Sequence, residues 1–295
     1  MTRIGFIGLG IMGGPMASNL LTAGFEVLGF DVVPAALERL TADGGTVAVS
    51  AAQAAAESDV VITMLPNHPQ VEAVALGEGG VLDSAKPGTL YVDMSSIRPE
   101  TSRKLAEVGS VRGIRVLDAP VSGGEKGAID GVLSIMVGGS EADFAAAAPV
   151  FAPLGKTIVH VGPAGAGQTV KAANQLVVGG TYALVAEAIV LLEASGLDAG
   201  VGLDVLAGGL AASRILDLKR ESMVARRFAP GFRIDLHHKD MGIILAAARD
   251  AEVALPVGSL VAALIASARA QGYGQLDHSA LLKVAENLSG KGAAE

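Results

Sequence analysis

Apolar residues in the first half of the chain gather in short runs that are separated by amphipathic stretches. The amphipathic stretches, for example residues 34–40 and 98–110, carry apolar positions at helical spacing. Short Val- and Ile-rich runs that alternate with helical patterns predict βαβ units, and hence a largely parallel sheet with helices on both faces. The runs that we interpret as strands cover residues 3–8, 26–31, 59–65, 89–94, 114–120, 133–139 and 157–162.

The pattern changes after residue 162, where the strand-like runs stop and only helical periodicity continues. We therefore predict an α/β domain over residues 1–162 and an all-helical domain over residues 163–295. Because pockets commonly form between domains, we expect the substrate site in the cleft between these two. The helices predicted for the second domain cover residues 168–194, about 200–225, 237–251, 258–272 and 277–288.

Composition adds limits on partners and chemistry. Of the 295 residues, 51% are hydrophobic and 18% are charged, so a large core is expected. The formal net charge of −8 argues against nucleic acid or an anionic membrane as a partner, and a small anionic substrate would need a local positive group. The absence of cysteine excludes disulfides, thiolate metal sites and cysteine nucleophiles.

Two segments resemble targeting or membrane signals. The N-terminus has a basic residue before an apolar run, as in a weak signal peptide, but the regular glycine spacing there has a better explanation. Residues 176–192 are nearly long enough to cross a bilayer, yet Glu187 interrupts them and Gly179 and Gly180 weaken them. We therefore predict a cytoplasmic protein without a membrane span.

The N-terminal glycines have the spacing of a dinucleotide-binding turn. Gly8, Gly10 and Gly13 form a G-x-G-x-x-G pattern that follows a predicted strand and precedes a predicted helix. In that context the glycines allow a tight turn, a close approach of the backbone to a pyrophosphate and close helix–strand packing. The expected cofactor-binding segment comprises Gly8, Leu9, Gly10, Ile11, Met12 and Gly13.

Asp31, at the end of the second predicted strand, bears on the choice of cofactor. An acid at this place binds the 2′-hydroxyl of the adenosine ribose and repels a 2′-phosphate. The next residues, Val32 and Val33, provide no cation, and Arg39 is too far along its helix to receive a phosphate. We predict that NAD(H) is preferred and that NADP(H) is possible.

Ser122, Gly123 and Gly124 follow the predicted strand that ends near residue 120. Ligands of open α/β sheets bind outside the carboxyl ends of the strands. Small residues leave backbone N–H groups uncovered, and the serine hydroxyl adds a donor, so we predict a loop that holds a carboxylate.

One lysine interrupts the long apolar helix predicted for residues 168–194. Lys171 shares a helix face with Asn174 and Gln175, and Tyr182 continues the same stripe. Three polar groups on an apolar helix suggest the wall of a pocket. The positive end of the helix dipole and partial burial are both expected to lower the pKa of the lysine.

Hydride transfer to a carbonyl carbon needs a group of this kind. The developing alkoxide must be protonated, and a lysine ammonium can supply the proton and stabilise the charge. We predict Lys171 as the general acid/base, with Asn174 holding the hydroxyl or the lysine in place.

Residues 237–240 combine two histidines with a lysine and an acid. Adjacent His237 and His238 diverge by about 100° on a helix, so we do not predict a metal site. Lys239 is the local positive charge that an anionic substrate would need.

With these features, the sequence resembles the β-hydroxyacid dehydrogenase family. The matching motifs, in family order, are GFIGLGIMGGPMASNL, ITMLP, DMSS, DAPVSGG, GAGQTVKAANQ and HHKD. The resemblance implies a Rossmann-type N-terminal domain and an all-helical C-terminal domain that supports oligomerisation. It also implies that Lys171 is catalytic and that Ser122, Gly123 and Gly124 hold the substrate carboxylate.

The same resemblance implies further contacts. Leu65, Pro66 and Ser96 would lie along the cofactor, and Lys239, with Asp240 beside it, would close over the nicotinamide and the substrate. Many relatives have asparagine four residues after the lysine, whereas this chain has Gln175 there and Asn174 one residue earlier. Either amide is therefore open as the substrate contact.

Within the family, the motifs resemble most the branch that reduces tartronate semialdehyde to D-glycerate. A 3-hydroxyisobutyrate dehydrogenase, a succinic or glyoxylic semialdehyde reductase and a non-catalytic dinucleotide-binding module are the alternatives. The expected ligand is in each enzymatic case a small anionic semialdehyde or hydroxy acid. The apolar surface of the long helix predicts a homodimer or homotetramer.

Overall fold

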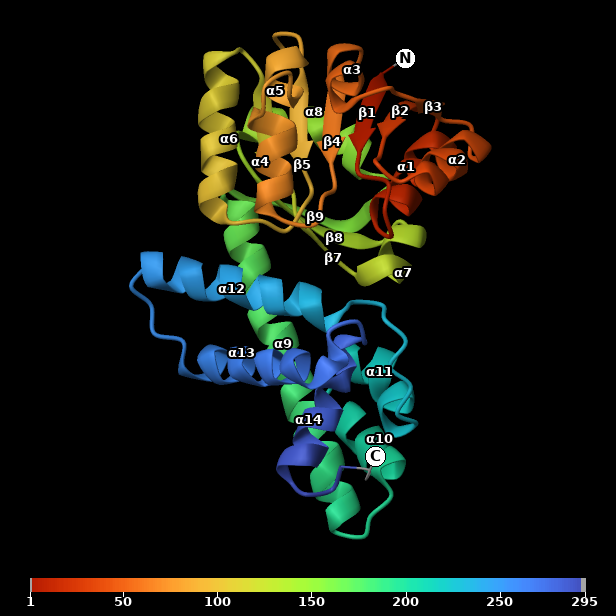
Figure 1. Cartoon of the computed structure of the whole chain (residues 1–295), viewed down its shortest axis with the longest axis vertical. Coiled ribbons are helices and arrows are strands. Elements are labelled where there is room, and N and C mark those ends of the chain that lie inside the picture. Colours follow the sequence, from red (N-terminus) through yellow and green to blue (C-terminus); the bar gives the residue numbers. More distant parts are fainter. Residues whose placement is uncertain (1, 293–295) are drawn as a thin grey trace. The chain divides into compact units, whose positions relative to one another are not determined.

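The computed structural model of the protein describes residues 2–292 (Figure 1). The chain divides into two compact units, residues 1–171 and residues 172–295. Strands lie in the first unit, and the described part of the second unit is helical.

The first unit is built on one sheet. Its strands are β1 (Arg3–Ile7), β2 (Glu26–Phe30), β3 (Thr46–Val47), β4 (Val60–Thr63), β5 (Leu90–Asp93), β6 (Arg115–Asp118), β7 (Val121–Ser122), β8 (Leu133–Gly138) and β9 (Gly155–Gly162). They lie in the order β3-β2-β1-β4-β5-β6-β8-β7, with β9 paired to β8. The 3-2-1-4-5-6 part of this order is that of a Rossmann-type sheet, which confirms the predicted α/β fold.

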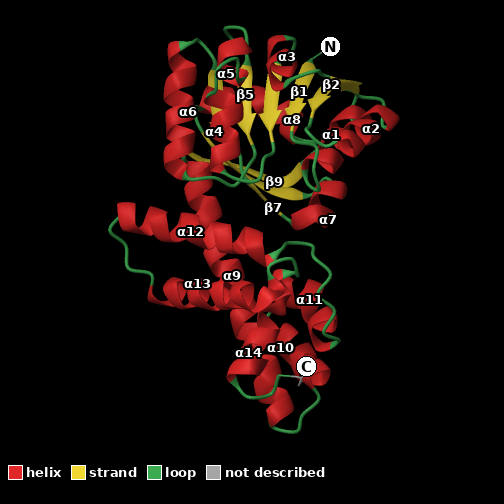
Figure 2. Ribbon diagram, viewed as in Figure 1, coloured by secondary structure: helices red, strands yellow, loops and turns green. Residues whose placement is uncertain are grey.

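Helices cover this sheet on both faces (Figure 2). They are α1 (Gly13–Thr22), α2 (Pro34–Ala42), α3 (Ala51–Ala56), α4 (His68–Leu76), α5 (Val81–Ser84), α6 (Pro99–Val111), α7 (Gly124–Ile129) and α8 (Glu141–Phe151). Successive strand residues enter opposite cores, as the pleat requires. In β4, Val60 and Ile62 belong to one core cluster and Val61 to the other, so the strand is apolar without alternation.

Two strands and the reversed direction of β8 and β9 differ from the sequence-based prediction. β3 and β7 have two residues each, which is too short for a hydrophobic period to be recognised. β8 runs antiparallel to β6 and β7, whereas β1, β2, β3, β4, β5 and β6 pair in parallel. Ser122, expected in a loop, therefore lies in β7, and Gly123 and Gly124 form the turn into α7.

The long helix α9 (Ala166–Ala194) begins in the first unit and continues through the second. The second unit further contains α10 (Ala199–Ala207), α11 (Arg214–Val224), α12 (Ile234–Asp250), α13 (Pro256–Ala268), the π-helical turn η1 (Arg269–Tyr273), the 3₁₀ turn η2 (His278–Ala280) and α14 (Leu281–Leu288). Its core includes Tyr182, Ile189 and Ile265, which are fully or almost fully buried. The helix predicted to end at residue 272 changes form after Ala268, and Gly272 takes a positive φ there.

Within the described residues, α9 is the one helix long and apolar enough to cross a membrane by length and composition, and 44% of its most apolar window is buried. The core helix of a soluble protein passes the same test. Ile189 of α9 has no exposed surface, so the side of the helix that carries it packs in the protein core.

Candidate active site

The glycine turn between β1 and α1 has the open backbone that a dinucleotide needs. Gly8 has a φ of +97°, and a Cβ at Gly13 would overlap the carbonyl oxygen of Gly8. These two glycines therefore make the turn possible. Gly10 is exposed, with no atom within 4 Å of the place where a Cβ would stand. That open space fits the approach of a pyrophosphate to the start of α1.

The carboxylate of Asp31 connects the end of β2 to this turn. It accepts a hydrogen bond from the N–H of Leu9 at 2.6 Å and another from the N–H of Val33 at 2.8 Å. Asp31 thus fixes the glycine turn while it remains partly accessible. The neighbouring Val32 is 86% exposed, so an apolar side chain stands at the position after the acid.

Leu65 and Ser96, both expected along the cofactor, are half-buried, and Pro66 is exposed. The hydroxyl of Ser95, which no motif in the sequence marks as a site residue, accepts a hydrogen bond from the N–H of Leu65 at 2.9 Å. Ser95 in turn donates to the carboxylate of Asp93 at 2.6 Å. The adjacent strand ends at β4 and β5 are therefore joined by side chains.

Asp93 is the buried centre of this network. Its Oδ1 also accepts a hydrogen bond from the Thr63 hydroxyl at 2.7 Å. Burial raises the pKa of Asp93 to about 6, because an ionised carboxylate loses its hydration inside the protein. The alternation of Asp93 with Ser95 after an apolar strand is the sequence signal that could have identified the pair.

Ser122, Gly123 and Gly124 combine a hydroxyl with a backbone that only glycine adopts easily. Gly123 has a φ of +142° and Gly124 a φ of +63°. Ser122 is half-buried and Gly123 is exposed, so this segment is partly accessible.

Asp118 holds the start of α9, a role that the sequence alone does not indicate. Its carboxylate accepts hydrogen bonds from the N–H of Gly165 at 2.7 Å and the N–H of Gln168 at 3.0 Å. These donors lie at the N-terminus of the helix, where backbone N–H groups have no partner within the helix. Burial raises the pKa of Asp118, and the backbone donors oppose that shift.

Lys171 lies one turn into α9 and does not extend to solvent. The residue is 8% exposed, and its ammonium donates a hydrogen bond to the carbonyl oxygen of Val121 at 2.7 Å. Val121 directly precedes Ser122 and Gly123. The fold of the first unit therefore places the lysine amine next to the predicted carboxylate-binding segment, although 50 residues separate them.

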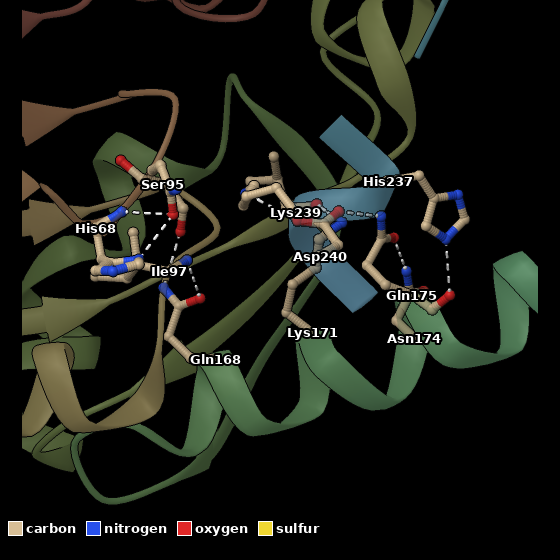
Figure 3. A network of polar contacts seen from close by, with 12 residues as sticks. His68, Ser95, Ile97, Gln168, Lys171, Asn174, Gln175, His237, Lys239 and Asp240 are labelled. Carbon is tan, nitrogen blue, oxygen red and sulfur yellow. Dashed lines mark hydrogen bonds and ion pairs between the residues drawn. The ribbon is translucent and has the colours of Figure 1, made fainter. Parts of the chain in front are cut away.

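In the second unit, Asn174 and Gln175 belong to a polar chain that ends on α12 (Figure 3). Asn174 Nδ2 donates to Gln175 Oε1 at 2.8 Å, and Gln175 Nε2 donates to Asp240 Oδ2 at 2.6 Å. Lys239 Nζ forms an ion pair with Asp240 Oδ1 at 2.8 Å. The second unit thus brings Asn174, Gln175, Lys239 and Asp240 together.

His237 is fully buried and contacts His278, with 3.0 Å between the two Nδ1 atoms. Its Nε2 lies 3.2 Å from the backbone carbonyl oxygen of Gln175. Among residues 2–292, no three histidine or acidic side chains are grouped so that they could hold a metal ion.

Comparisons with known proteins agree with the two-part fold. The family model for the NAD binding domain of 6-phosphogluconate dehydrogenase matches residues 3–162. The model described as NAD-binding of NADP-dependent 3-hydroxyisobutyrate dehydrogenase matches residues 165–285. Together they cover most of the chain.

Similar proteins match over nearly their whole length. A 2-hydroxy-3-oxopropionate reductase of Escherichia coli strain K12 is 44% identical, covering 97% of this chain and 98% of the relative. A 2-(hydroxymethyl)glutarate dehydrogenase of Eubacterium barkeri is 43% identical, and the match covers 98% of this chain and 96% of the relative.

A solved structure of 3-hydroxyisobutyrate dehydrogenase of Mycobacterium tuberculosis with L-serine superimposes with a TM-score of 0.88 and 39% identity, covering 96% of this chain and 99% of that one. This chain therefore belongs to the β-hydroxyacid dehydrogenase family and is an NAD(P)-dependent oxidoreductase acting on CH–OH groups.

Proposed function

We propose that the protein reduces a small carboxylate-bearing semialdehyde, foremost tartronate semialdehyde to D-glycerate, with NADH as the preferred reductant. The observation that carries the proposal is the hydrogen bond from Lys171 to Val121, because it fixes an amine beside Ser122 and Gly123. The 44% identity to a 2-hydroxy-3-oxopropionate reductase supports this choice of substrate.

The proposed roles follow from the chemistry of each group. Backbone N–H groups of Gly123 and Gly124, with the hydroxyl of Ser122, hold the substrate carboxylate. The nicotinamide, when bound, supplies the hydride. Lys171 gives a proton to the carbonyl oxygen as negative charge develops there, and it takes the proton back in the reverse direction. We assign Lys239 to the substrate and the cofactor, since its ammonium offers positive charge in a chain of net negative charge.

The cofactor proposal rests on the end of β2. Asp31 places a carboxylate beside the glycine turn, and the exposed Val32 and Val33 provide no positive charge. A 2′-phosphate would meet repulsion there without a compensating cation, so NAD(H) is preferred over NADP(H). Leu65, Pro66 and Ser96 are proposed to line the same cofactor.

Self-association is proposed from one face of α9. Val177, Leu184 and Leu191 are each 68% exposed and recur every seven residues, which places them along one side of the helix. An apolar stripe of this kind is typical of an interface, so we propose a homodimer or a homotetramer formed with this face buried. A cytoplasmic location and a division into two domains after residue 162 are further parts of the proposal.

A sister activity, 3-hydroxyisobutyrate dehydrogenase, is the second candidate. It is favoured by the TM-score of 0.88 to an enzyme of that name and requires the same lysine and the same carboxylate site. The reactive carbon carries the same kind of oxygen in both cases, so Lys171 serves either reaction.

The decisive experiment is a comparison of kcat/KM for tartronate, methylmalonate and succinic semialdehydes, each with NADH and with NADPH. We expect the highest value for tartronate semialdehyde with NADH. A higher value for methylmalonate semialdehyde would establish the sister activity instead, and no turnover with any of the three would refute the enzymatic proposal.

A further inference from the structure

The hydrogen bonds from Lys239 to Asn174 determine which end of each side-chain amide, NH₂ or oxygen, faces its neighbour. Gln175 and Asp240 are almost fully buried, with 5% and 3% of their surface exposed. Water therefore cannot replace a lost partner easily, and each donor must face an acceptor.

The charge at one end of the chain fixes the first amide. An ionised carboxylate only accepts hydrogen bonds, and the ion pair with Lys239 at 2.8 Å matches an ionised Asp240. Gln175, 2.6 Å from Asp240, must therefore present its NH₂ group to the carboxylate. Its carbonyl oxygen then points to the other side.

The second amide follows from the first. Because Gln175 Oε1 is an acceptor, Asn174 must turn its own NH₂ group toward it, as the 2.8 Å contact indicates. The oxygen of Asn174 is thereby directed away from Gln175. A carboxamide is nearly symmetric in shape, so these partners, and not the steric fit, decide which end it exposes.

The backbone of the same turn is also held. A carbonyl oxygen only accepts, so His237 carries its proton on Nε2 where it meets the carbonyl of Gln175 at 3.2 Å. His237 Nδ1 lies 3.0 Å from His278 Nδ1 on the other side of the ring. Gly179 permits this approach, because a Cβ there would stand 3.0 Å from His237 Nε2.

We propose that Gln175 and Asp240 are positioning residues, and that they fix the amide of Asn174 with its oxygen toward the substrate. Asn174 and Lys171 are three residues apart on α9 and share a helix face. The 2-hydroxyl of tartronate semialdehyde, which can donate, then meets the acceptor oxygen of Asn174, while Lys171 gives its proton to the neighbouring carbonyl oxygen. The inference rests on the proposed function and decides which of the two neighbouring amides touches the substrate.

An exchange of charges tests this proposal. Gln175→Glu places two acceptors face to face, and we expect kcat/KM to fall roughly 10- to 100-fold at alkaline pH, where a carboxyl pair does not share a proton. Adding Asp240→Asn gives the introduced carboxylate a donor at position 240, so that it is held in place and accepts from Asn174 in the original geometry. The double variant should recover at least about 10-fold over Gln175→Glu alone.

The matched control combines Gln175→Glu with Asp240→Ala, which supplies no donor and should give no recovery. Equal kcat/KM values for the two double variants would overturn the proposal. If Gln175 itself contacted the substrate, replacing it would cost the same whether position 240 were Asn or Ala. A merely structural loss would likewise lower both double variants together.

Neutron diffraction of the deuterium-exchanged protein provides a test that does not depend on turnover. It distinguishes amide nitrogen from oxygen and should place the deuterons of Asn174 toward Gln175 and those of Gln175 toward Asp240. The opposite orientation of Asn174 would overturn the inference. If the orientation is as stated but no semialdehyde is reduced, the proposed function fails and the positioning network does not.

Discussion

The ammonium of Lys171 lies 2.7 Å from the carbonyl oxygen of Val121, and this hydrogen bond joins the start of α9 to the segment that follows β6. The contact holds the amine at the edge of the sheet where ligands of α/β folds bind. Asp118 stabilises the same helix start through the N–H groups of Gly165 and Gln168. The lysine is therefore fixed by the fold before any substrate binds.

Replacement of Lys171 should remove proton transfer and leave cofactor binding intact. Lys171→Met keeps most of the buried volume of a side chain that is 8% exposed. We expect kcat/KM to fall by about 10² to 10⁴, the usual contribution of a general acid. Steady-state kinetics measures the loss, and NADH binding measured by fluorescence is the control. Unchanged turnover would contradict the mechanism.

A change of charge at the end of β2 should alter the cofactor preference. The double variant Asp31→Ser, Val32→Arg removes a repelling carboxylate and adds a cation that can bind a 2′-phosphate. We expect the ratio of kcat/KM for NADH to that for NADPH to fall by at least about 10-fold. Val32→Arg alone, which keeps Asp31, should change the ratio less. Equal efficiency with both cofactors in the unmodified protein would already disprove the preference.

Two helical glycines should respond in opposite ways to alanine. A Cβ at Gly179 would stand 2.9 Å from Val261 and 3.0 Å from His237, so Gly179→Ala should lower the free energy of unfolding by about 1–3 kcal/mol. Gly242 has no atom within 4 Å of the corresponding position, and Gly242→Ala should raise it by up to about 1 kcal/mol. Urea denaturation measures both, and similar effects at the two sites would contradict the packing argument.

Asp93 should make stability depend on pH in a defined direction. Its pKa is raised from 3.8 to about 6 in the folded protein. Between these values the folded state binds more protons than the unfolded state, so the free energy of unfolding falls as the pH rises. The shift of roughly two pKa units corresponds to about 3 kcal/mol, lost in full above about pH 6.

Asp93→Asn removes this titration while it keeps an acceptor for Ser95 and Thr63. The difference in unfolding free energy, variant minus unmodified protein, should therefore grow by about 3 kcal/mol from about pH 4 to about pH 7. Parallel pH profiles of the two proteins in urea denaturation would show that Asp93 does not titrate as described.

A charge in the apolar stripe of α9 should weaken self-association. Leu184 is 68% exposed and lies between Val177 and Leu191. We expect Leu184→Glu to shift the sedimentation coefficient at micromolar concentration toward that of the monomer, because the charge would be buried in the interface. Val111→Glu, at a position 86% exposed on α6, is the control and should sediment like the unmodified protein. A monomeric unmodified protein would rule out the proposed interface.

The sequence determined much of the fold and the family. Gly8, Gly10 and Gly13 identify the dinucleotide turn because local backbone geometry requires them, and the change from strand to helical periodicity near residue 162 needs no tertiary information. Lys171 is also recognised from the sequence alone, because it is a single charge in an otherwise apolar helical segment. These features depend on neighbours in sequence.

Tertiary structure alone decided the partners of these residues. Asp93, Ser95 and Asp118 were not predicted as parts of the site, because their hydrogen bonds join strand ends and helix starts that are distant in sequence. The antiparallel direction of β8 depends on pairing between strands, which hydrophobic periodicity does not encode. The orientation of the Asn174 amide likewise depends on Asp240, 66 residues away, through Gln175. Hydrogen bonds between side chains that meet only in the folded protein determine whether each amide presents its NH₂ group or its oxygen.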